Sequence, residues 1–247
     1  MKVETTHIGS LPFVQLNQAI EFTFKFDIPV LFTLPHLDPK QFMGIDVLSR
    51  THNLASLDIE LPYEKEFFKR LASQDSKIFK TQLIGPITLH KYFLKDQTLE
   101  SVASKLGVLY KNLINRFIEK GDLFLVIDEP ALKSRSEIEF LNEFFYKLNI
   151  VDCEVGLHCC SDINEEIFEL LKIKNKQLDW SLRNKDNFNR DEVFLGGLEM
   201  RAPETWGNFL FSKKNLIISP ACGLANESNP EMRFQRLTEL KTFLETL

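Results

Sequence analysis

Short apolar runs alternate with longer amphipathic segments along most of the chain. Each run has the length of one buried strand and is bounded by glycine, proline or polar residues. Eight runs of this kind predict eight strands, over residues 3–10, 29–37, 78–86, 123–130, 153–160, 176–182, 192–199 and 215–223.

The segments between these runs have helical spacing. The clearest helix is predicted over 98–120, where five apolar residues recur at steps of three or four: Val102, Leu106, Leu109, Leu113 and Phe117. Similar spacing predicts further helices over 136–149, 163–174 and 232–247. Alternating strands and helices imply parallel neighbours, because a tight hairpin cannot join parallel strands.

Eight strands with intervening helices favour an α/β fold of one kind, a single (β/α)8 TIM barrel. A chain of 247 residues suits one such domain, spanning 1–247. An open, doubly wound sheet is the alternative, and a nucleotide-binding sheet of that type would carry a glycine-rich turn after an early strand. HIGSLP (7–12) and IGPITL (84–89) contain one glycine each, so neither the dinucleotide nor the phosphate-loop fingerprint is present.

Charge and composition narrow the function classes. The net charge of −5 argues against a nucleic-acid surface, which needs clustered Lys and Arg. No apolar stretch reaches the length of a membrane span, and MKVETTHIGS (1–10) lacks the apolar core of a secretory signal. Four cysteines, two of them adjacent, do not resemble a disulfide framework. We therefore expect a cytoplasmic protein that binds neither nucleic acid nor membrane.

Polar residues gather at the C-terminal ends of the predicted strands. In a barrel these ends form the face that carries the active site, although ordinary loops are polar as well. The residues are Thr6, His7, Ser10, His36, Asp38, Gln82, Thr88, Asp128, Glu129, His158, Cys160, Asp179, Glu199 and Cys222.

The segment VGLHCCSD (155–162) contains a candidate metal site. Alternate side chains of a strand point the same way, so His158 and Cys160 share a face while Cys159 packs as a small hydrophobic residue. An H-x-C pair alone also suits a buried histidine beside a cysteine. A third ligand, Cys222, changes the interpretation because a barrel brings both strand ends to one rim, and Gly223 is expected to give the backbone freedom to turn there. Two thiolates, one imidazole and an open position favour catalytic zinc.

Five motifs, in this order, resemble the C-terminal catalytic barrel of cobalamin-independent methionine synthase. They also resemble its shorter single-barrel relatives in the uroporphyrinogen decarboxylase-like superfamily. The motifs span nearly the whole chain: TTHIGSLP (5–12), IGPITL (84–89), VIDEPAL (126–132), HCC (158–160) and SPACGL (219–224).

The resemblance implies a zinc-dependent methyltransferase. Zinc held by His158, Cys160 and Cys222 binds the thiol of homocysteine, and the sulfur receives a methyl group from a folate or corrinoid donor. The resemblance also implies that Asp128 is a catalytic residue that meets the substrate's ammonium group. In the same way, Ile8, Gly9 and Ser10 are the expected receptors of the substrate's carboxylate.

The chain departs from the full-length enzyme at several places. Family zinc sites add a carboxylate near the end of the sixth strand, where this chain offers Asp179 as a ligand or as a partner of one. Glu199 or Arg201 stands near the place of a proton-delivering histidine. The second-strand glutamate and the extra N-terminal barrel are missing, so a corrinoid or accessory protein stays open as a partner.

Two other functions are compatible with parts of this pattern. A non-catalytic barrel can keep zinc for binding a ligand or a partner. Porphyrinogen decarboxylation shares the superfamily fold, but it needs an arginine-rich N-terminal segment, and TTHIGSLPFVQLNQ (5–18) contains no arginine.

Overall fold

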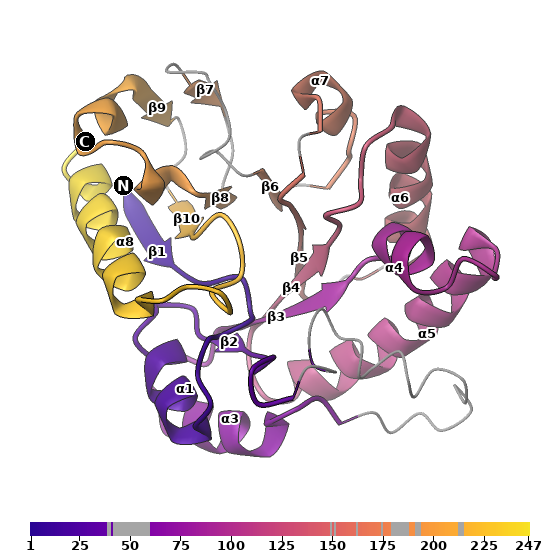
Figure 1. Ribbon diagram of the computed structural model, residues 1–247, viewed down its shortest axis with the longest axis horizontal. Helices are drawn as coiled ribbons and strands as arrows, with labels where there is room; N and C mark the ends of the chain where they lie inside the picture. Colours follow the sequence, from indigo (N-terminus) through magenta and orange to yellow (C-terminus); the bar gives the residue numbers. More distant parts are fainter. Residues whose placement is uncertain are drawn as a thin grey trace.

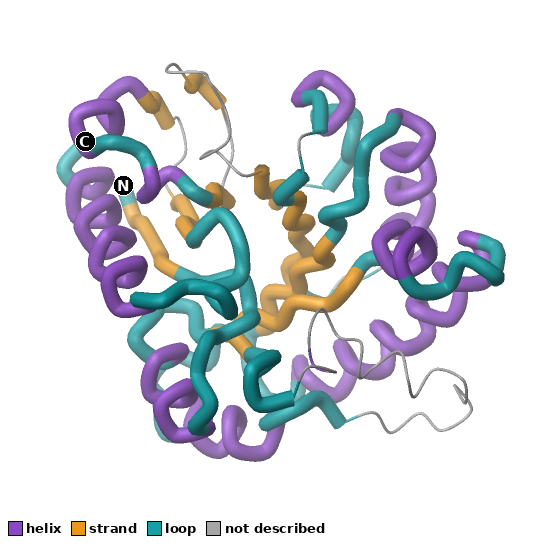
Figure 2. The backbone as a smooth tube through the Cα atoms, viewed as in Figure 1, coloured by secondary structure: helices purple, strands orange, loops and turns teal. Residues whose placement is uncertain are grey.

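The computed structural model describes residues 1–38, 41, 60–148, 150, 152–161, 163–173, 175–178, 188–190, 194–211 and 215–247. Most strands lie toward the centre of the molecule, with helices outside them (Figures 1 and 2). The described strands are β1 (Lys2–Thr5), β2 (Val30–Leu31), β3 (Phe79–Ile84), β4 (Leu123–Asp128), β5 (Glu154–Cys159), β6 (Asn175–Leu178), β7 (Phe188–Arg190), β8 (Phe194–Gly196), β9 (Phe209–Phe211) and β10 (Asn215–Ser219). The described helices are α1 (Leu16–Thr23), α3 (Glu64–Leu71), α4 (Pro86–Tyr92), α5 (Leu99–Ile118), α6 (Arg135–Leu148), α7 (Glu165–Phe168) and α8 (Pro230–Glu245), with 3-10 helices η4 (Leu198–Met200) and η5 (Pro203–Asn208).

All the strand pairs are parallel. One sheet has the order β2–β3–β4–β5–β6, a second has the order β8–β10–β1, and β7 pairs with β9. The two larger sheets approach each other at both ends: an isolated parallel bridge joins Ser10 to Thr33, and β6 lies beside β8. The predicted α/β class is therefore confirmed. Because the described strands pair as separate sheets rather than as one continuous ring, the closed barrel stays a prediction.

Apolar side chains of the described residues form two separate clusters. The larger cluster packs strands against the surrounding helices and includes Leu125 and Ile127 of β4. Their neighbours along β4 point to the opposite face, as the two-residue period of a strand requires. There they join the smaller cluster, which contains Ile8, Phe124, Val126 and Phe194, with Ile217 packed against it. Since these residues come from both larger sheets, the inner faces of the two sheets share one small core.

Local sequence explains where α5 and α8, the two longest described helices, begin. The side chain of Thr98 accepts a hydrogen bond from the Ser101 N–H and caps the start of α5. All five apolar residues that predicted α5 are buried. Asn229 caps the Met232 N–H in the same way, and Pro230 occupies the first turn of α8, where its missing N–H costs nothing.

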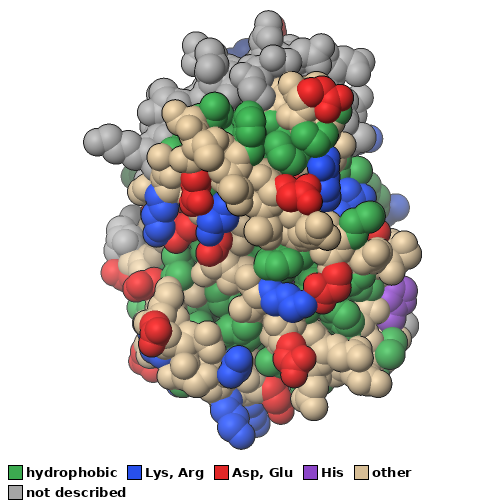
Figure 3. All heavy atoms as spheres, turned by 90° about the vertical axis from the view of Figure 1, so that its left-hand side faces the viewer, with side chains coloured by type: hydrophobic (Ala, Val, Ile, Leu, Met, Phe, Trp, Pro, Cys, Tyr) green, Lys and Arg blue, Asp and Glu red, His purple; other side chains and the backbone are tan. Residues whose placement is uncertain are grey.

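Acidic and basic side chains are interspersed over the face that carries α8 (Figure 3). Ion pairs on this side include Lys25 with Glu231 at 2.6 Å and Lys241 with Asp27 at 2.9 Å. Exposed pairs of this kind contribute roughly 0–1 kcal/mol each. Among the described helices, none has both the length and the apolar character that a bilayer crossing requires.

Each of the eight predicted strands overlaps an observed strand, and the four predicted helices coincide with α5, α6, α7 and α8. The helix predicted over 163–174 is much shorter, because α7 ends at Phe168. Strands β7 and β9 were not predicted, since three residues carry too little periodicity. Helices α1, α3 and α4 were missed for a similar reason, because none is longer than 8 residues.

Candidate metal centre

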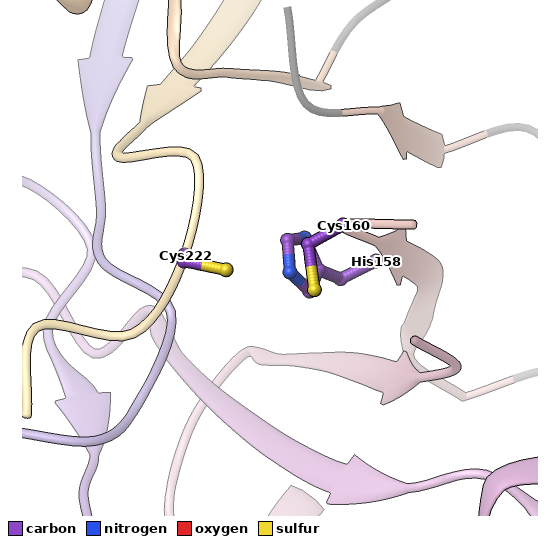
Figure 4. A group of neighbouring side chains, drawn as sticks. All are labelled: His158, Cys160 and Cys222. Atoms are coloured by element: carbon purple, nitrogen blue, oxygen red, sulfur yellow. The ribbon is translucent and has the colours of Figure 1, made fainter. Parts of the chain in front are cut away.

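The end of strand β5 provides two of the three predicted metal ligands: His158 lies in the strand and Cys160 directly follows it. His158 and Cys160 are two residues apart, and Figure 4 shows both side chains on the same side of the strand end. His158 is 1% exposed. Cys159 points the other way and is buried in the larger apolar cluster, as its predicted packing role requires.

Cys222 reaches the same place from the loop that follows β10. Its sulfur points across the intervening space toward Cys160 and His158 (Figure 4). One donor atom from each of the three residues lies within 4.8 Å of the other two. Soft thiol sulfurs combined with an imidazole suit zinc better than magnesium or calcium, so this group fits the predicted ion.

Two contacts hold the Cys222 loop against its neighbours. The Leu224 N–H donates to the Ser10 carbonyl at 2.8 Å, and His36 Nε2 donates to the Ala225 carbonyl at 2.6 Å. Gly223 makes room for the first contact, because a Cβ built there would lie 2.0 Å from Ser10 Oγ. The predicted reason for Gly223 was therefore wrong: its φ lies outside the left-handed region, and what the position requires is close approach.

Asp128 lies beside the metal ligands because it pairs in register with His158 across β4 and β5. Its Oδ1 is 4.0 Å from His158 Nε2 and has no hydrogen-bond partner among the described residues. Burial raises the pKa of Asp128, while the charge of His158 and a hydrogen bond from Gln82 oppose that rise. A hydrogen bond with Cys222, followed by burial, raises the pKa of the Cys160 thiol, which a bound cation would reverse.

A cavity of about 270 Å³ joins the predicted site residues. It is lined by the metal cluster and by the predicted substrate-binding residues Ile8, Gly9, Ser10 and Asp128. The structure thus brings into one space residues from β4, from β5 and from the loops after β1 and β10. A space of this size accommodates a small molecule of amino-acid dimensions.

The turn after β1 contains an internal hydrogen bond that occupies one of its backbone N–H groups. Gly9 has φ of 114°, a conformation that favours glycine, and its N–H donates to His7 Nδ1 at 3.2 Å. The Gly9 amide is thus engaged within the turn, and its role as a receptor of a substrate carboxylate stays a prediction. The neighbouring Ser10 amide has no such bond to the residues that the structure describes.

His7 is a supporting residue of this turn. It is fully buried, and its Nε2 lies 2.8 Å from Thr23 Oγ1. Because Nδ1 accepts from Gly9, the proton must be on Nε2, which then donates to the threonine. Burial, followed by the charge of Lys80, holds the pKa of His7 well below its usual value, in agreement with a neutral ring.

Glu129, which directly follows Asp128, holds the end of β4 in place next to the site. This buried carboxylate accepts hydrogen bonds from the N–H groups of Ile87 and Thr88 at 2.9 and 2.8 Å, and from Thr88 Oγ1 at 2.6 Å. Burial raises its pKa to about 7, although these bonds oppose the shift. Glu129 therefore fastens the first turn of α4 to the end of β4.

Lys80 is the residue that the sequence analysis missed. It is fully buried on β3, where a lysine inside the apolar run 78–86 was the available signal. Asp179, the predicted carboxylate ligand, lies outside the described residues. Glu199 is buried in η4, and neither it nor Arg201 lines the cavity within the described part of the chain.

Comparisons with known proteins address the fold. No protein-family model matches the sequence, and no curated protein matches it. A crystal structure named "Putative Vitamin-B12 Independent Methionine Synthase from Listeria monocytogenes" is similar over 96% of this chain and 96% of that chain. Its TM-score is 0.53 and its sequence identity is 15%, which supports a shared α/β fold.

Proposed function

We propose that this chain is a zinc-dependent methyltransferase that transfers a methyl group to a small thiol, with homocysteine as the acceptor and methionine as the product. The observation that carries the proposal is the group formed by His158, Cys160 and Cys222, whose donor atoms lie within 4.8 Å of one another at the wall of a cavity. The similarity in fold to a protein named as a methionine synthase agrees with it.

Zinc is the cofactor we propose for this group. Three protein ligands leave a position open for a substrate atom, as in catalytic rather than structural zinc sites. Bound there, zinc would lower the pKa of a substrate thiol and supply a thiolate at neutral pH. Asp179 remains our candidate for a further ligand or for a partner of a ligand. We place the protein in the cytoplasm, where thiols stay reduced.

The other cavity residues suit an amino acid. Asp128 Oδ1 is free of hydrogen bonds from the described residues and can accept one from an ammonium group, which is a strong, charge-assisted contact. The Ser10 N–H, in a turn that also includes Ile8 and Gly9, is a donor for a carboxylate. We propose that the closed single barrel brings these groups together, with a methylfolate or a methylcorrinoid as donor, the latter presented by a corrinoid or accessory protein.

Metal analysis tests this proposal most directly. We expect one zinc per wild-type chain and its loss in Cys222→Ser. The matched control is Cys153→Ser, since Cys153 is a free, half-buried cysteine outside the cluster. X-ray absorption should then detect an additional sulfur ligand after homocysteine is added. A folded wild-type protein that takes up no zinc would contradict the proposal.

Turnover separates catalysis from binding. The zinc-loaded protein is assayed for methionine formation from homocysteine with methylfolate and, in parallel, with methylcobalamin. Product with either donor supports the transferase and identifies the donor class. Stoichiometric zinc and thiol binding without turnover with either donor would instead indicate a non-catalytic zinc protein.

A further inference from the structure

Lys80 is a buried lysine next to the cavity. It does not line the cavity itself, but Gln82, two residues along the same strand, does. Its side chain is 0% exposed, which is costly for an amine unless polar groups surround it. Nζ donates to the His7 carbonyl and to Gln82 Oε1, the latter at 3.0 Å, and lies 5.8 Å from the centre of the Phe194 ring. Lys80 therefore connects β3 with the end of β1 and with β8, across the space between the two larger sheets.

Gln82 stands between this lysine and the cavity. It shares the inner face of β3 with Lys80 because the two are separated by one residue. Gln82 lines the cavity and Lys80 does not. The Gln82 side chain also hydrogen-bonds Asp128 and so favours the ionised form of that carboxylate. The polar contacts thus run from Lys80 through Gln82 to Asp128.

The chemistry of these groups fixes the orientation of the Gln82 amide. Lys80 Nζ donates to Gln82 Oε1, so the Gln82 carbonyl oxygen faces Lys80. Its NH2 group then faces Asp128, where it can donate to one carboxylate oxygen. The other oxygen, Oδ1, is buried and has no hydrogen bond from the described residues, so it is an acceptor whose hydrogen-bonding capacity is unused.

We propose that Lys80 is a positioning residue: by holding the Gln82 amide, it orients Asp128 to bind the ammonium group of an amino-acid thiol. The inference rests on the proposed function, because it concerns how the same cavity selects its substrate. It predicts that Lys80 contributes to the preference for thiols that carry an amino group, without touching them. A purely structural lysine would instead affect all ligands of the site alike.

The experiment compares two ligands on zinc-loaded protein by calorimetry. Homocysteine carries the amino group, and 4-mercaptobutanoate is the same molecule without it. We expect Lys80→Met to weaken homocysteine binding by roughly 10- to 100-fold, the range for a hydrogen bond to a charged group. Binding of 4-mercaptobutanoate should change by less than about threefold, because that ligand lacks the group that Asp128 would hold.

The matched control is Lys77→Met. Lys77 precedes β3, and its amine donates to the backbone carbonyls of Leu71, Ala72 and Gln74, away from the cavity. Its removal should leave the affinity ratio of the two ligands unchanged. Gln82→Met should reproduce the loss of preference, and it decides the question if Lys80→Met does not fold.

The outcomes are distinct. A wild type that binds neither thiol contradicts the proposed function, and the inference fails with it. A wild type that prefers homocysteine, together with a Lys80→Met variant that keeps this preference, overturns the inference alone. An equal loss of affinity for both ligands also overturns it, since that result indicates a structural lysine.

Discussion

His158 lies in strand β5 and Cys160 directly follows it, whereas Cys222 comes from a loop, and the two sides of the cluster are supported differently. On the strand side, β5 pairs with β4 and with β6, so backbone hydrogen bonds on both edges hold His158, and Cys160 directly follows the paired residues. On the loop side, Cys222 is exposed, and its loop is held by the contacts of Leu224 with Ser10 and of His36 with Ala225.

Because the two sides are supported differently, changes on the strand side should affect mainly the free energy of unfolding, and changes on the loop side mainly the metal affinity. A change on the strand side disturbs buried packing and should lower the free energy of unfolding while leaving the folded site intact. A change on the loop side costs few buried contacts, and it should lower metal affinity because the third ligand is less well placed. Four variants follow, from the largest expected effect to the smallest; the first concerns the buried lysine of β3, and the other three test this division.

Lys80→Met should change how stability depends on pH. Burial lowers the pKa of Lys80 from 10.5 to about 7, so the unfolded chain takes up a proton between these values while the folded protein does not. The free energy of unfolding of the wild type therefore decreases as pH falls from about 10 to about 7, by at most about 5 kcal/mol. Below that range Lys80 causes no further loss. Methionine does not titrate. Urea unfolding of the metal-free proteins should show that the free energy of unfolding of the variant rises relative to that of the wild type as pH falls through this range. A difference that does not change with pH would contradict the lowered pKa of Lys80.

Gly156→Ala tests packing on the strand side. A Cβ at this position would lie 3.0 Å from the Asn175 carbonyl and from two ring carbons of Phe124. We expect a loss of about 1–3 kcal/mol in the free energy of unfolding, with zinc affinity of the folded protein unchanged. Gly107→Ala is the control, since its Cβ would meet Leu148 at 3.5 Å. That change should stabilise α5 by about 0.5–1 kcal/mol. Loss of zinc affinity in Gly156→Ala would erase the distinction between the two sides.

The sequence predicted the strand side well and the loop side in part. Two-residue periodicity is a local property, so the common face of His158 and Cys160, and the burial of Cys159, follow from the strand alone. That Cys222 comes near them could be predicted only from the barrel arrangement and the family resemblance. The role of Gly223 could not be predicted, because it depends on how near another loop lies.

Buried polar residues were the hardest to interpret. Lys80 and Glu129 occupy apolar runs or their ends, and nothing in their neighbours along the chain indicates which distant groups satisfy them. His7 is one of the polar residues at the predicted strand ends, yet its ring faces Thr23 and the Gly9 amide. Tertiary contacts decide whether a polar group near a strand end faces a ligand or supports a turn, and sequence spacing contains no such information.

Gly223→Ala tests the first contact of the loop side. The new Cβ would lie 2.0 Å from Ser10 Oγ and 3.3 Å from Ser10 Cβ, so the serine must turn and the loop must move outward. We expect zinc affinity to fall by roughly tenfold, about 1.4 kcal/mol, with the unfolding midpoint of the metal-free protein unchanged. Chelator competition measures the affinity. Adding Ser10→Gly removes the clash and should restore binding; failure to do so would mean that another contact positions Cys222.

His36→Ala should give the smallest effect. His36 is exposed, and its one bond to the Ala225 carbonyl steadies the loop three residues beyond Cys222. A single hydrogen bond of this kind contributes about 0.5–1 kcal/mol, which corresponds to a two- to fivefold loss of zinc affinity. His90→Ala is the matched control, because His90 makes the same kind of bond to the Gln97 carbonyl at 3.0 Å, away from the cluster. Both variants should lose similar, small amounts of stability, and only His36→Ala should bind zinc more weakly. Equal zinc affinities in the two variants would show that the Ser10 contact alone holds the loop side.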